Sequence, residues 1–201
     1  MSRKDARQRL LDAAIEHVAA NGFSDLSLRS LASALGTSHR MLIHHFGSKE
    51  GLWVEIVRAV EQRQRDVLGD LLPDPDAPFA EAMRVWWKHI SDPSLWPNER
   101  LFFEIYGQAI QGRPHTTHVL DGIVEDWVEP IAELSVARGI PRGVATAHAR
   151  LGVAVTRGLL LDLVATRDIE AVDGAMEAFI DVYEAWLAQA APAAEEHAAG
   201  R

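Results

Sequence analysis

Residues 28–50 read LRSLASALGTSHRMLIHHFGSKE. This stretch begins with four apolar residues at the spacing of one helical face: Leu28, Leu31, Ala32 and Leu35. Ser27 can cap the helix that carries them, and Gly36, which tolerates a positive φ, can end it. A second short helix is expected over residues 38–46. Ser48 can then cap a long third helix. The stretch therefore predicts two short helices joined by a tight turn and followed by a longer one.

Two short helices joined at a glycine are the organisation of a helix-turn-helix, here over about residues 27–46. Leu42 and Phe46 can anchor the second helix, which leaves its other side facing outward. In a helix-turn-helix, the N-terminal residues of the second helix are presented to base edges in the major groove. Arg40 can bond guanine O6 and N7 together, and Ser38 and His39 can bond bases or phosphate. A glycine turn between short helices also occurs in bundles that bind no DNA, and there Arg40 is an ordinary surface arginine.

Residues 5 to about 60 resemble the N-terminal domain of the TetR family of transcriptional repressors. The matching residues are 28–38, Leu42, His45-Phe46, Ser48-Lys49-Glu50 and Leu52. Ile43 stands where the family usually has tyrosine, so a phenol donor is missing here. The resemblance implies that His45 and Lys49 contact the DNA backbone, and Lys49 lies in the first turn of a helix, whose amides favour an anion. The residues predicted to bind DNA are Ser27, Thr37, Ser38, His39, Arg40, Ile43, His44, His45 and Lys49.

Composition and charge agree with a DNA-reading segment on a larger globular protein. The chain has 201 residues, of which 48% are hydrophobic and 24% charged, as in folded rather than disordered proteins. The net charge is −9, but residues 1–50 hold seven Lys/Arg against five Asp/Glu and the remainder thirteen against twenty-four. The first part can therefore meet a polyanion although the whole chain is acidic. With no cysteine, no signal-peptide pattern and no membrane-spanning stretch, a cytoplasmic protein is expected.

The remainder of the chain also has helical periodicity, interrupted by proline and glycine at 73–78, 91–98, 112–114 and 139–141. An all-α chain of about nine helices is predicted. Residues 1–51 form the predicted DNA-binding domain and residues 52–189 a larger ligand-binding and dimerisation domain. Residues 190–201 are predicted to be a disordered tail.

The region 74–139 is rich in aromatic residues, most of which are expected in a core. Ligand cavities are likewise apolar with a few polar groups, so a pocket for a small apolar or aromatic effector is the alternative. The predicted pocket residues are Trp86, Trp87, His89, Phe102, Phe103, Tyr106, His118, Trp127 and Arg157. Arg157 lies in an apolar stretch and needs a partner, either Asp162 or an acid group of the ligand, because an unpaired buried charge is costly.

Residues 142–188 predict two long helices with broad apolar faces. The apolar face predicted on the first comprises Ala147, Leu151, Ala154, Val155, Gly158, Leu159 and Leu161. A stripe is predicted on the second at Ala175, Phe179, Val182, Tyr183 and Trp186. In the TetR family the last two helices pair with their symmetry mates, so the resemblance implies a homodimer. An ordinary core within one chain is the alternative.

These features predict a homodimeric transcriptional regulator, a repressor that binds a pseudo-palindromic DNA operator and is released by a small molecule. No cofactor is expected. His115, His118 and Asp121 could hold a metal ion, although a surface cluster is the simpler interpretation. A DNA-binding activator or architectural protein is one alternative. A helical enzyme using histidines with Glu104 or Asp121 is another, but the sequence has no nucleophile motif, phosphate loop or His-Glu-x-x-His pattern, and we predict that the protein is not an enzyme.

Overall fold

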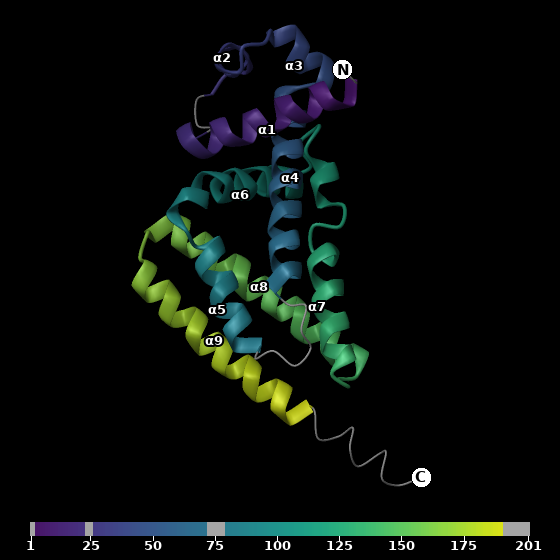
Figure 1. Cartoon of the computed structure of the whole chain (residues 1–201), viewed down its shortest axis with the longest axis vertical. Helices are drawn as coiled ribbons and strands as arrows, with labels where there is room; N and C mark the ends of the chain where they lie inside the picture. The colour runs from purple at the N-terminus through teal and green to yellow at the C-terminus, as the bar shows by residue number, and fades with distance from the viewer. Residues whose placement is uncertain (1–2, 23–25, 72–78, 191–201) are drawn as a thin grey trace. The chain divides into compact units, whose positions relative to one another are not determined.

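The computed structural model describes residues 3–22, 26–71 and 79–190, and these residues are helical with no β-strand among them (Figure 1). The described α-helices are α1 (Arg3–Asn21), α2 (Leu28–Ala34), α3 (His39–Phe46), α4 (Lys49–Leu71), α5 (Phe79–Ile90), α6 (Trp96–Ile110), α7 (Glu125–Ala137), α8 (Arg142–Thr166) and α9 (Ile169–Ala190). Two short 3₁₀ helices, η1 (Pro93–Leu95) and η2 (Thr117–Leu120), lie before and after α6. The predicted all-α class is confirmed.

The described residues divide into two compact units. The first contains the chain up to Gln64 together with Asp92–Asp121, and the second contains Arg65–Ser91 and the chain from Gly122 onward. These units do not coincide with the predicted domains 1–51 and 52–189. Those domains were defined by function, as a DNA-binding and a ligand-binding domain, and they stay a prediction. Of the predicted tail, residues 191–201 lie outside the described residues, as do residues 73–78 of the first predicted break.

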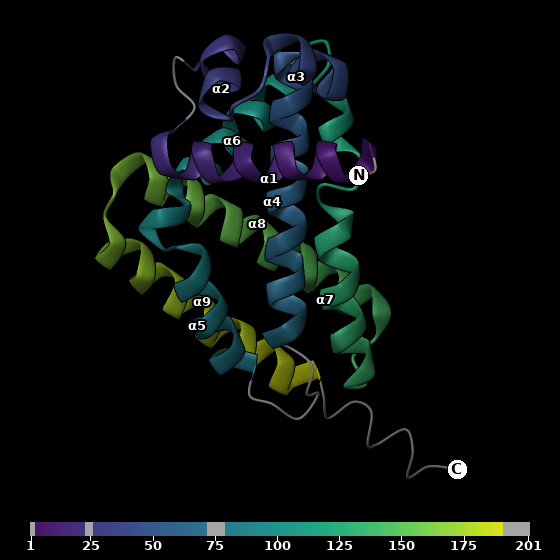
Figure 2. The ribbon, with the colours of Figure 1, turned by 45° about the horizontal axis from the view of Figure 1, so that its top comes forward.

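The first unit is built on α1, which lies across α4 (Figure 2). The apolar face of α1 is buried at Leu11, Ala14, Ile15 and Val18. Two ion pairs of 2.5 Å join the helices, one between Arg7 and Glu55 and the other between Arg63 and Asp12. Helix α1 also packs on α6. The two ion pairs therefore tie α4 to α1 at Glu55 and Arg63.

One predicted break is shorter than expected. Helix α6 begins at Trp96 and includes Pro97 and Asn98, which were predicted to belong to the irregular segment 91–98. Proline is tolerated in the first turn because its missing N–H would have no intrahelical acceptor there. Asp92 caps the preceding turn, its Oδ1 accepting from the amide of Ser94 at 2.8 Å.

The second unit has a core between α7 and α8, with α9 packed on α8 and α5. Its buried residues are Val128, Ala132, Ile140, Ala145, Ala149 and Val153. Tyr183 of α9 is buried among the rings of Phe79, His148, Phe179 and Trp186. Burial raises the pKa of Tyr183 above its usual value, against the opposing effects of Ser135 and Arg138.

The outward faces of α8 and α9 are apolar. On α8, seven exposed small or apolar residues recur at alternating spacings of three and four: Val144, Ala147, Leu151, Ala154, Gly158, Leu161 and Ala165. On α9 the same spacing gives Ala171, Ala175, Ala178, Val182 and Ala185. The predicted α9 stripe is therefore corrected: Tyr183 is buried and Phe179 packs on it, so neither belongs to the outward face.

Within the described residues, no helix combines the length and apolar character needed to cross a lipid bilayer.

Candidate nucleic-acid interface

The turn between α2 and α3 is formed by the residues that were predicted for it from the sequence. Ser27 caps α2, with its Oγ accepting from the amide of Ser30 at 3.0 Å. Gly36 has φ +63°, and the Thr37 amide donates to the carbonyl of Ala32 at 2.9 Å. This left-handed turn closes α2 and reverses the chain toward α3. The predicted turn chemistry is confirmed.

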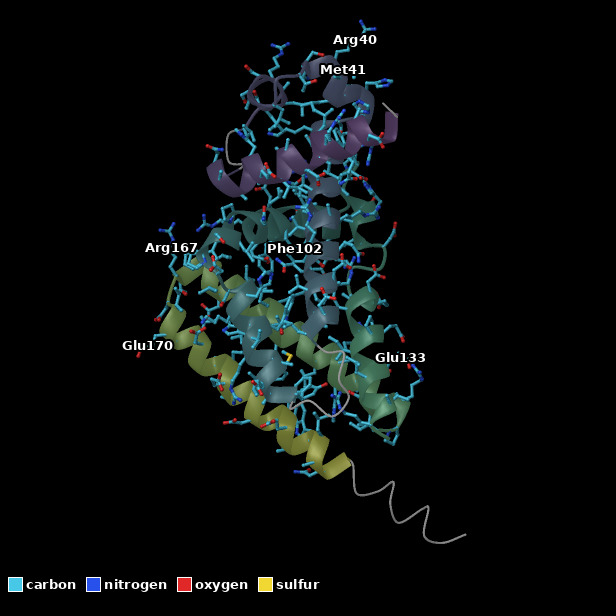
Figure 3. The ribbon with its side chains drawn as sticks, viewed as in Figure 1. Arg40, Met41, Phe102, Glu133, Arg167 and Glu170 are labelled. Atoms are coloured by element: carbon cyan, nitrogen blue, oxygen red, sulfur yellow. The ribbon has the colours of Figure 1, made fainter. Side chains whose placement is uncertain are left out.

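Helix α3 divides into a buried side and an exposed side. Leu42 is fully buried and Phe46 is 8% exposed, so they anchor the helix. The opposite side carries exposed residues His39, Arg40, Ile43 and His44. Figure 3 shows the Arg40 side chain pointing outward from α3. Arginine, imidazole and apolar groups thus lie along the exposed side of an eight-residue helix.

Met41 is exposed beside Arg40 and was missed in the sequence analysis (Figure 3). The residue type alone does not indicate whether Met41 packs inward with Leu42 or faces solvent. Helical spacing was the available signal, because Met41 is offset from both anchors by about 100° or more.

The predicted hydroxyl contacts have a second role. Ser38 is the N-cap of α3, its Oγ accepting from the Met41 amide at 3.2 Å, and Ser27 caps α2. Thr37 is half-buried. A capping hydroxyl still carries one hydrogen that it can donate to a phosphate.

The junction between α3 and α4 is tight. Ser48 caps α4, its Oγ accepting from the Gly51 amide at 2.9 Å. A Cβ at position 51 would lie 2.3 Å from the carbonyl oxygen of Phe46, so only glycine lets the two helices approach this closely. Lys49 begins α4 and its Nζ lies 5.8 Å from the ring centroid of Trp53. Gly51 was not identified as important from the sequence.

His45 differs in burial from the exposed residues of α3. It is half-buried and lines a cavity of about 360 Å³ together with Arg7, Phe46, Gly47, Ser48, Gly51, Glu55, His115 and His118. The backbone contact that the family resemblance implies for His45 stays a prediction.

The histidines do not form a metal site in the part of the chain that the structure describes, where no three His, Asp or Glu side chains come together suitably. The His44 and His45 rings meet edge to face with centroids 5.2 Å apart. His115 is exposed with φ +69°, and His118 is half-buried in the cavity. Arg58 donates to the carbonyl of His118 and pairs with Asp121 at 3.8 Å.

The predicted effector-pocket residues are divided between the two units. Phe102, Phe103, Tyr106 and His118 belong to the first, and Trp86, Trp87, His89, Trp127 and Arg157 to the second. Trp86 is buried with its ring centroid 5.7 Å from that of Trp127, while His89 is exposed. The Trp87 indole donates to Asp173 at 2.7 Å. Several of these rings therefore belong to the core.

Arg157 has a backbone partner that the sequence did not predict. Its guanidinium donates to the backbone carbonyl of Ile123 at 2.5 Å. Residue types alone could not indicate a carbonyl acceptor, and the predicted acidic partner, Asp162 or an acid group of a ligand, stays a prediction.

The fold and the exposed side of α3 together define a helix-turn-helix protein. Residues 10–56 match the family model described as "Bacterial regulatory proteins, tetR family". The chain is 51% identical over 47 residues to the HTH-type transcriptional regulatory protein RaaS of Mycobacterium tuberculosis, covering 23% of this chain and 22% of RaaS. It is 32% identical over 66 residues to the HTH-type transcriptional repressor AcnR of Corynebacterium glutamicum, covering 33% and 35%. These alignments span a fifth to about a third of the length of those relatives.

Solved structures extend the similarity of fold to nearly the whole chain. A transcriptional regulator from Rhodococcus sp. Rha1 aligns with a TM-score of 0.71 at 19% identity, over 88% of this chain and 95% of that one. The multidrug binding protein EbrR, solved in complex with imidazole, aligns with a TM-score of 0.62 at 26% identity, over 91% and 93%. The predicted resemblance to the tetR family is thereby confirmed for residues 10–56, and the solved structures share the fold of the larger part of the chain.

Gly51→Ala tests the α3–α4 junction. Alanine favours a helix interior by about 1 kcal/mol over glycine, but the clash with the Phe46 carbonyl costs more, since overpacking typically costs about 1–3 kcal/mol. We expect a lower free energy of unfolding in chemical denaturation. Gly69→Ala in the same helix is the matched control, because nothing lies near its Cβ position, and it should stabilise the protein. A Gly51→Ala protein as stable as Gly69→Ala would contradict the close approach.

Proposed function

We propose that the protein is a sequence-specific DNA-binding transcriptional regulator that reads the major groove with α3. The observation that carries the proposal is the exposed group His39, Arg40, Ile43 and His44 on a helix anchored by buried Leu42 and Phe46. The matching family model covers the same residues. Arg40 is the residue best suited to select a base, because two N–H groups of its guanidinium can donate to O6 and N7 of guanine.

Phosphate contacts come from other residues. Lys49 stands at the positive end of a 23-residue helix, and the capping hydroxyls of Ser27 and Ser38 lie at two further helix starts. Such contacts set affinity and its salt dependence but carry little sequence information. The proposed interface therefore has one set of residues that selects the base sequence and another set that binds phosphates and positions the protein on the DNA.

Arg40→Ala and Lys49→Ala test this division of roles. Selecting bound fragments from genomic DNA gives the operator, and fluorescence titration then gives the affinity. Lys49→Ala should weaken all sequences about equally, whereas Arg40→Ala should relax preference at one base pair, at about 1–3 kcal/mol. Lys88→Ala, on the exposed side of α5, is the control and should change neither. Unchanged affinity and preference in Arg40→Ala would show that α3 does not read the bases.

The exposed apolar faces of α8 and α9 support a homodimer. Their alternating spacings of three and four are those of a helix-packing seam, and both helices carry one. A second copy of the chain offers the same two seams, so a two-fold axis can bury all four together. Small residues on both seams allow close approach. The dimer would present two copies of α3 to half-sites about one helical turn apart.

Val182→Glu tests the dimer. Val182 is 46% exposed in the chain and should be buried in the dimer, so a carboxylate there should give monomers in light scattering without loss of helical signal. Ala188→Glu is the control and should leave the dimer intact. Ala188 lies on the same exposed side of α9 as the acidic residues Glu177, Asp181 and Glu184. If the wild type is a well-folded monomer at micromolar concentration, the dimer is excluded.

We further propose that the protein is a repressor released by a small apolar or aromatic molecule. AcnR is named a repressor and EbrR a multidrug binding protein, which supports both parts by analogy. The aromatic residues of α5 and α7, within the second unit, supply apolar surface for such a ligand. A DNA-binding protein with no ligand response would instead fit the activator or architectural alternative.

Phe103→Ala in the first unit and Trp86→Phe in the second test the predicted effector residues of each unit separately. Both keep the fold better than Trp86→Ala, since Trp86 is buried and its truncation would cost about 3–5 kcal/mol. A melting-temperature screen identifies ligands, and operator titration shows whether each lowers DNA affinity. We expect the variants to respond less while binding DNA normally without ligand. Ligands that stabilise the protein but leave operator affinity unchanged would show that binding and release are not coupled.

A further inference from the structure

The cavity behind α3 has the lining of a binding site. Four segments contribute: Arg7 from α1, His45 and Phe46 from the end of α3, the start of α4, and His115 and His118 from the segment after α6. Its volume of about 360 Å³ is at the small end of the range for small-molecule sites, about 300–1,000 Å³. All of these residues belong to the first unit. The cavity is distinct from the predicted effector pocket, with which it shares only His118.

Arg7 is held in place at the wall of this cavity. Its Nη2 contacts Glu55 at 2.5 Å, and its guanidinium carbon lies 5.1 Å from the ring centroid of Phe46. A guanidinium has five N–H donors, and Glu55 uses only part of that capacity. A carboxylate and a ring that fix an arginine reduce the entropy lost when it binds a further anion.

The other polar groups of the lining also favour an anion. Imidazoles come from three positions, and each neutral ring can donate one N–H. The cavity is lined by Gly47, Ser48 and Gly51, so it adjoins the N-terminal turn of the 23-residue helix α4. That turn carries a partial positive charge and amides with no intrahelical acceptor. Glu55 is the one carboxylate of the lining, and Arg7 neutralises it.

The size and the apolar part of the lining select among anions. A bare inorganic ion would fill a small part of about 360 Å³, whereas the Phe46 ring offers an apolar surface to an organic group. A metal ion is a poorer candidate, because the described residues offer no suitable group of three ligands.

We propose that this cavity binds a small organic acid, with its oxyanion on Arg7 and the histidines and its apolar part near Phe46. The ligand would touch Phe46, Gly47 and Ser48, which connect α3 to the N-terminal cap of α4. Occupancy would therefore change the position of α3 and with it DNA affinity, a consequence that rests on the proposed DNA-binding function.

Binding is tested first without DNA, by calorimetry with three probes. Benzoate carries a ring and an oxyanion, benzamide carries the ring without the charge, and inorganic phosphate carries the charge without the ring. Benzoate should bind more tightly than the other two. Benzamide binding as tightly as benzoate would overturn the anion site, equally tight phosphate would overturn its organic character, and no binding by any probe would overturn the site.

Two variants locate the binding. Arg7→Gln combined with Glu55→Gln removes the anion-binding cation while keeping the wall neutral, and His118→Gln removes one imidazole. The double variant should bind benzoate about tenfold more weakly or worse, as expected for a lost charge-assisted hydrogen bond. His17→Gln, elsewhere on α1, should bind as the wild type does. Circular dichroism of each variant confirms folding, and imidazole NMR shifts of the wild type report the site independently. Shifts confined to histidines outside the cavity would overturn the proposal.

Operator titration in the presence of benzoate distinguishes a failure of this proposal from a failure of the proposed function. Benzoate that binds the cavity and changes operator affinity supports both. If benzoate binds but no operator can be selected, the proposed function fails and the binding site stands. If an operator is bound and benzoate competes through Lys49 alone, with Arg7 and the histidines unaffected, the cavity proposal fails and DNA binding stands.

Discussion

The contact between the end of α3 and the start of α4 is the constraint on which the rest of the candidate interface depends. The Phe46 carbonyl lies where any side chain at position 51 would stand, and Ser48 caps the helix in the same turn. The orientation of α3 is thereby tied to a 23-residue helix, which ion pairs from α1 hold in turn. A recognition surface built on eight residues can keep its shape only if it is fixed in this way, because so short a helix is unstable alone.

The same junction explains how different residues of α3 can anchor the helix and read the DNA. Leu42 and Phe46 are buried and anchor the helix. The exposed residues of α3 contribute little to the core, so they can differ with the operator without loss of the fold. The hydroxyls of Ser27 and Ser38 close helix ends and can still donate to a phosphate. The protein therefore places its structural residues and its candidate base-reading residues on opposite sides of one helix.

Much of the first unit could be predicted from the sequence, because its signals are local. Helical periodicity gave Leu28 and Leu31 of α2, Gly36 required a positive φ, and Ser27, Ser38 and Ser48 stood directly before helix starts. The signals that failed are not local. A carbonyl acceptor for Arg157, the close approach at Gly51 and a cavity joining Arg7 to His118 depend on residues distant in sequence. Aromatic density likewise cannot separate a core ring such as Trp86 from a ring that lines a ligand site.

The central claim is that α3 contacts the operator, and site-specific photo-crosslinking tests it most directly. A photoreactive amino acid at position 43 replaces Ile43, which is 36% exposed on the outward side of α3, and one at position 85 replaces Val85, which is 48% exposed on α5. The account predicts a crosslink to operator DNA from position 43 and none from position 85. Crosslinking from position 85 with none from position 43 would contradict it.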